Sequence, residues 1–63
     1  MPDTTLLSPD DLSTRWGIPT TTLAGWRYRG TGPAYLKLMG HVRYRAADVE
    51  AYERDNVHGV SAE

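Results

Sequence analysis

The sequence predicts a small α+β domain with two helices joined by a tight turn, then a two-stranded hairpin and a closing helix. Two short apolar periodic segments carry helix-capping residues at their ends, which indicates the helices. Two later segments alternate apolar and polar residues around a glycine, which indicates the hairpin. A chain of 63 residues, 40% of them apolar, has room for one small core.

Composition excludes several classes of protein. The sequence has no cysteine, which excludes a disulfide framework and a thiolate zinc site. No apolar run approaches the roughly 18 residues of a membrane span. No Ser/His/Asp or paired-carboxylate set falls on adjacent predicted elements. We therefore expect a cytoplasmic protein that is not an enzyme, has no cofactor or metal, and does not bind a membrane.

The first helix is predicted over residues 9–16. Ser8 suits the N-cap, Pro9 suits the first helical position, and Asp11 can complete a capping box. Gly17 is expected to end the helix in a left-handed conformation.

A second helix is predicted over residues 20–29, after a three-residue turn. Leu23 and Trp26 lie three residues apart and mark its inward stripe. Two helices joined by a short turn that contains glycine form the helix-turn-helix arrangement.

The hairpin is predicted from residues 35–39 and 42–45, joined across Gly40 and His41. Its expected core-facing residues are Leu36, Leu38, Val42 and Tyr44.

A third helix is predicted over residues 47–55, with Val49 and Tyr52 facing inward and Glu50 paired with Arg54. We expect residues 1–6 to be flexible, residues 7–55 to form the domain, and residues 56–63 to form a flexible acidic tail.

Charge is segregated along the chain. Residues 12–47 contain six of the seven Lys and Arg residues and no Asp or Glu, although the net charge is −1. A basic segment between acidic ends indicates a polyanionic partner that the net charge conceals.

Together the predicted elements form a minimal winged helix-turn-helix. In that geometry the second helix enters the DNA major groove and the hairpin, or wing, reaches a phosphate backbone or the minor groove. Phosphates and base edges are contacted by cations and hydroxyls. The candidate DNA-binding residues are Arg15, Thr20, Thr21, Thr22, Arg27, Tyr28, Lys37, His41, Arg43 and Arg45.

Each of these candidates has a structural alternative. The threonines at the start of the second helix would equally serve as helix caps. Lys37 and Arg43 would equally form a solvated strand face, and His41 would be a tolerated turn residue. Trp16 and Trp26 have the helical spacing of core residues rather than of base-stacking platforms. Gly25 would allow close approach of either DNA or the first helix.

About residues 6–54 resemble the excisionase-like branch of the MerR-type winged helix-turn-helix family. The most specific matches are Gly-Pro-x-Tyr-x-Lys-Leu before the wing, Val-Arg-Tyr-Arg in the wing and Asp-Val-Glu-Ala-Tyr after it. The resemblance implies DNA contacts from the threonines at 20–22 and from His41 and Arg43. The sequence departs from the family at Pro19, where a capping serine is common, and at Gly25, where a longer polar residue often stands.

The resemblance also implies a function. Small proteins of this branch are recombination directionality factors of phages or integrated elements in bacterial cells. They bind repeated sites, bend the DNA and direct an integrase toward excision. The expected partners are double-stranded DNA, an integrase and neighbouring copies of the same protein, which would be a monomer in free solution. The alternatives are a small transcriptional regulator of the same fold, or a protein-interaction adaptor or antitoxin.

Overall fold

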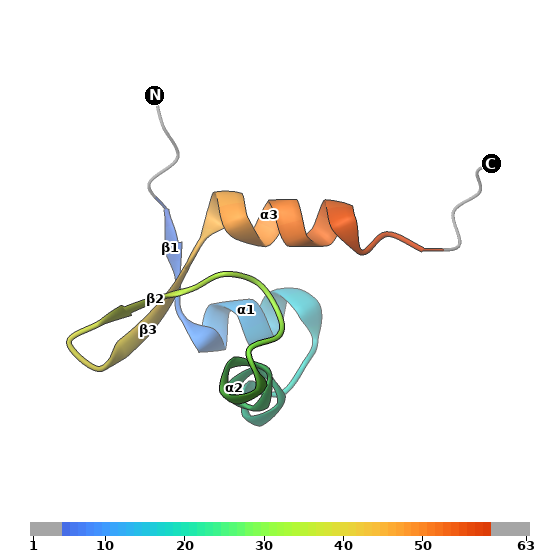
Figure 1. Ribbon diagram of the computed structural model, residues 1–63. Helices are drawn as coiled ribbons and strands as arrows, with labels where there is room; N and C mark the ends of the chain where they lie inside the picture. Colours follow the sequence, from blue (N-terminus) through green and yellow to red (C-terminus); the bar gives the residue numbers. More distant parts are fainter. Residues whose placement is uncertain (1–4, 59–63) are drawn as a thin grey trace.

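The computed structural model describes residues 5–58, which form three helices and a three-stranded antiparallel sheet (Figure 1). The strand order in the sheet is β1-β3-β2, so the last strand lies in the middle. None of the helices in this part of the chain is long and apolar enough to cross a membrane. In chain order the elements are β1 (Leu6–Leu7), α1 (Pro9–Trp16), α2 (Thr20–Arg29), β2 (Leu36–Leu38), β3 (His41–Arg45) and α3 (Ala46–Asp55).

The capping residues define α1 as predicted. The Ser8 hydroxyl accepts a hydrogen bond from the Asp11 backbone N–H, and the Asp11 carboxylate accepts one from the Ser8 N–H, each at 3.0 Å. At the other end, Gly17 has a φ of 67° and donates its N–H to the Ser13 carbonyl at 2.7 Å. The predicted bounds of α1 and α2 are confirmed, since both helices contain the expected residues.

The strand β1 was not expected from the sequence. Leu6 and Leu7 pair with Arg45 and Tyr44 of β3, and the backbone continues this contact through Ala46 N–H and the Thr5 carbonyl at 3.0 Å. Leu6 therefore belongs to the sheet rather than to a flexible N-terminus. Two residues are too few for a period of two to be visible. Of the expected flexible ends, residues 1–4 and 59–63 lie outside the described residues, while residues 56–58 are described and follow α3 outside any helix or strand.

The hairpin turn lies one residue earlier than predicted. Met39 and Gly40 form it, with φ values of 50° and 82°. Positive φ at both central residues is the type I′ geometry, which matches the right-handed twist of the strands. His41 is consequently the first residue of β3, opposite Leu38, and not a turn residue.

The sequence suggested that both strands of the hairpin present their apolar residues to the core. In the structure, the apolar residues of β2 and β3 lie on opposite faces of the sheet. Leu36 lies opposite Arg43 and Leu38 opposite His41, whereas Lys37 lies opposite Val42. Directly opposed residues share a face of the sheet, so Leu36 and Leu38 lie on the face away from Val42 and Tyr44. Leu38 is 47% exposed. The prediction that Leu36 and Leu38 face the core is wrong.

The core joins all three helices to the central strand. The buried cluster contains Leu12 of α1, Leu23 of α2, Tyr44 of β3 and Val49 of α3. Leu7, Trp16, Ile18, Trp26 and Val42 pack around it. The third helix starts directly at the end of β3, at Ala46, one residue before the predicted start. The expected pairing of Glu50 with Arg54 is wrong, because the ion pairs in the described part of the chain are Arg15–Glu53 and Arg45–Asp48.

Candidate nucleic-acid interface

The outer face of α2 carries exposed hydroxyl and basic side chains. Thr21 and Thr22 are exposed in the first turn, and Thr20 is half-buried. The residue before the helix, Pro19, makes no side-chain capping bond, and the three threonine hydroxyls make no hydrogen bond within residues 5–58. The capping alternative therefore receives no support, and the hydroxyls are free to bind a ligand. Further along, the Tyr28 side chain is 94% exposed.

Gly25 lies on this helix without a close neighbour from α1. The three atoms nearest to a Cβ built on Gly25 all belong to the Arg29 guanidinium, the closest being Nη1 at 3.3 Å. Close packing against the first helix does not account for this glycine. The Arg29 guanidinium lies over Gly25 instead.

Arg27, in contrast, is half-buried and bonded within the fold. Its Nη1 donates a hydrogen bond of 2.6 Å to the Tyr44 hydroxyl. The guanidinium carbon lies 5.8 Å from the ring centroid of Tyr35 and 5.9 Å from that of Tyr44, within the range of cation–π attraction. These contacts join the C-terminal half of α2 to the central strand, so the outer face of α2 and the hairpin have a fixed relative position.

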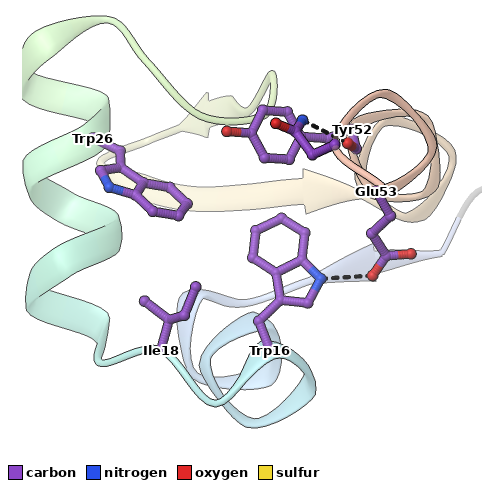
Figure 2. Close-up of a pocket in the computed structure, with 6 residues that line it drawn as sticks. Trp16, Ile18, Trp26, Tyr52 and Glu53 are labelled. Carbon is purple, nitrogen blue, oxygen red and sulfur yellow. Dashed lines mark hydrogen bonds between the residues drawn. The ribbon is translucent and has the colours of Figure 1, made fainter. Parts of the chain in front are cut away.

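Arg15 is also engaged within the fold. Its Nε and Nη2 donate to the two carboxylate oxygens of Glu53, each at 2.8 Å. The Trp16 indole N–H donates to the same carboxylate at 2.6 Å, as Figure 2 shows. The hydrogen bonds from Arg15 and Trp16 lower the pKa of Glu53 to about 2. The bond to Glu53 in turn raises the pKa of Arg15.

Arg45 has a similar partner, since its Nε donates to Asp48 at 2.8 Å. Thus α3 supplies carboxylates to two of the predicted DNA-binding cations. Among the basic residues of segment 12–47, Arg27, Arg29, Lys37 and Arg43 have no carboxylate partner in the described structure, and of these Arg27 is bonded to the Tyr44 hydroxyl.

The hairpin carries charges on both faces. Lys37 lies on one face, opposite Val42, while His41 and Arg43 lie on the other. Lys37 and His41 are exposed. Arg43 is half-buried and donates Nη1 to the neighbouring Val42 carbonyl at 2.6 Å, which leaves its other N–H groups available.

A recess lies between the C-terminal ends of α1 and α3 and the side of α2 (Figure 2). Its volume is about 320 Å³. The ring centroids of Trp16, Trp26 and Tyr52 are 5.7–6.5 Å apart, so the rings pack on one another. The lining residues are Trp16, Ile18, Trp26, Tyr52, Glu53 and Asn56.

The recess offers little chemistry beyond apolar contact. Its one carboxylate, Glu53, is already bonded to Arg15 and Trp16, and Asn56 Nδ2 donates to the Tyr52 carbonyl at 2.8 Å. No group of three or more His, Asp or Glu residues within residues 5–58 could hold a metal ion. The β2–β3 hairpin and the C-terminal end of α3, which borders the recess, lie at opposite sides of Figure 1.

The sequence contained no signal for the partners of Arg15 and Arg27. Glu53 lies 38 residues after Arg15, and Tyr44 lies 17 residues after Arg27, so both contacts depend on the tertiary fold. No family model, curated protein or solved structure matches the chain. The geometry of α2 and the hairpin is therefore the basis for a proposal about function.

Proposed function

We propose that the protein binds double-stranded DNA as a winged helix-turn-helix, with α2 in the major groove and the β2–β3 hairpin as the wing. One observation carries this proposal: α2 and the hairpin expose hydroxyls and cations and contain no carboxylate. The acidic residues of the described chain lie in α1 and α3 instead. Such a surface attracts a polyanion, because it carries cations and no carboxylate that would repel phosphates.

The contacts divide by chemistry. Arg29, Lys37 and Arg43 are the phosphate-binding cations, and they position the protein without reading the sequence. Thr21 and Thr22 occupy the first turn of α2, where hydroxyls contact base edges or thymine methyl groups. Arg27 positions the wing relative to α2 through Tyr44.

Within this class, we propose the excisionase role that the resemblance implies. Copies would bind adjacent sites on phage or integrated-element DNA in the bacterial cytoplasm, bend it and direct an integrase. Small transcriptional regulators of the same fold would use the same surface. DNA with one, two and three tandem sites distinguishes the roles: affinity per site that rises with site number, for a protein that is monomeric in free solution, supports the excisionase role. Independent sites or a free dimer would favour a regulator.

A salt titration of duplex binding tests the central proposal. Three phosphate contacts predict that log K falls with log salt with a slope of about −2.7, less steep than the slope of about −4 to −5 that four to six contacts would give. Arg29→Ala should reduce the slope by roughly 0.9.

Arg54→Ala is the matched control, because Arg54 is exposed on the acidic helix α3 and should leave the slope unchanged. A wild-type slope shallower than about −2 would contradict DNA binding and favour a protein-interaction adaptor.

A further inference from the structure

The tip of the hairpin has an unusual residue in an unusual conformation. Met39 is the one non-glycine residue with a positive φ in residues 5–58, at 50°. Side chains other than Gly, Asn and Asp adopt this region at an energetic cost. Met39 is also 97% exposed, so packing within the fold does not offset that cost. The type I′ turn sets this positive φ, but it favours Asn, Asp or Gly, so an exposed methionine at this position points to a functional contact.

We propose that Met39 is a wedge that enters a base step from the DNA minor groove and kinks the duplex. This inference rests on the proposed DNA binding and adds to it the mechanism of bending. Proteins that bend DNA from the minor groove insert apolar side chains, methionine among them, between adjacent base pairs. Methionine is unbranched and polarisable, so it can fill a thin space between aromatic rings.

The hairpin has the shape that this insertion requires. The turn is its far end and projects away from the three helices (Figure 1). A minor groove about 6 Å wide admits the side chain of a turn more readily than a whole two-stranded ribbon. Leu38 directly precedes the turn and is 47% exposed, so it adds apolar surface next to Met39.

The charges beside the turn fit a minor groove, which is bordered on both sides by a phosphate backbone. Lys37 lies on one face of the hairpin, and His41 and Arg43 lie on the other, while Met39 is in the turn that joins the two strands. A hairpin that merely lay along one phosphate backbone would need cations on one face only. Cations on both faces fit a tip that is inserted between two backbones.

Met39→Asn tests the wedge without disturbing the turn. Asparagine tolerates the left-handed region and is favoured in type I′ turns, so the variant should fold with an equal or higher melting temperature. Met39→Leu is the matched control, because leucine is also an apolar wedge. The measurements are the bend angle, from resonance energy transfer between dyes at the duplex ends, and the fluorescence of 2-aminopurine placed at successive steps.

The wild type and Met39→Leu should bend the duplex and raise 2-aminopurine fluorescence at one step. Met39→Asn should lose both effects while keeping the wild-type salt slope. A Met39→Asn variant that bends and unstacks the duplex like the wild type overturns the wedge and leaves DNA binding intact. A Met39→Asn variant that still bends the duplex but binds tandem sites without cooperativity also overturns the wedge, because Met39 would then contact a neighbouring copy of the protein. A wild type that shows no salt-dependent duplex binding overturns both proposals.

Discussion

Arg27 and Tyr44 are joined by a hydrogen bond of 2.6 Å that links the second helix to the central strand of the sheet. Tyr44 is only 1% exposed, so its hydroxyl is reached by Arg27 and not by bulk solvent. The same guanidinium lies over the rings of Tyr35 and Tyr44. This contact sets the angle between the two surfaces that we assign to DNA.

Tyr44→Phe should lower the free energy of unfolding by about 1–2 kcal/mol, because it removes the acceptor of a partly buried charged donor. Urea denaturation measures this change. Tyr28→Phe is the matched control and should leave stability unchanged, since the Tyr28 side chain is 94% exposed. Equal stability of Tyr44→Phe and the wild type would show that the bond contributes nothing.

Glu53 should make stability depend on pH in the acid range. Its pKa is about 2 in the folded protein, below the ordinary value of 4.5, because Arg15 and Trp16 donate to the ionised carboxylate. A lowered folded pKa gives stability that is fully present above pH 4.5 and is lost as the pH falls toward about 2.

The measurement is the difference in melting temperature between the wild type and Glu53→Gln. It should be constant above about pH 5 and should shrink toward pH 2, since the variant cannot ionise. A difference that does not change from pH 7 to pH 2 would mean that the ion pair does not stabilise the fold.

Gly25→Ala should stabilise the protein and weaken DNA binding. Alanine is favoured over glycine inside a helix by about 1 kcal/mol, and the nearest obstacle is the flexible end of Arg29. If DNA approaches α2 closely at Gly25, as in the proposed complex, the added methyl group would also obstruct it. Urea denaturation and fluorescence anisotropy with labelled duplex measure the two effects. An increase in stability with unchanged affinity would show that DNA does not approach α2 at this position.

Thr21→Ala and Lys37→Ala should separate sequence reading from phosphate binding. Thr21→Ala should reduce the difference in binding free energy between specific and random duplexes by about 1 kcal/mol, the value of one lost base contact. The lysine variant should weaken binding to both duplexes by the same factor. Competition binding with the two duplexes measures this difference in binding free energy. If Lys37→Ala reduced the difference and Thr21→Ala weakened both duplexes equally, the roles of α2 and the wing would be reversed.

The sequence predicted the helices well because their ends depend on neighbouring residues. Ser8, Asp11 and Gly17 act within four residues of their partners, and each acts as expected. The hairpin register was harder to predict, because methionine in a left-handed turn position is not a sequence signal for a turn. The two-residue strand at Leu6 and Leu7 depends on its pairing with β3, and no local pattern reveals such pairing.

The candidate site was predictable in outline and not in detail. The basic segment was visible in the sequence, but the ion pairs of Arg15 and Arg45 with α3 were not. These pairs reduce the number of cations available to DNA. Exposure of Thr21, Thr22, Lys37 and His41 agrees with the expected interface, while Arg27 holds its two parts together.

The sheet also limits how copies of the protein can meet. Its outer strands, β1 and β2, have two and three residues, and β3 lies between them. Edges this short are poor templates for the addition of a strand from another molecule. Copies crowded on adjacent DNA sites would therefore touch through side chains and separate again, instead of merging their sheets into an aggregate.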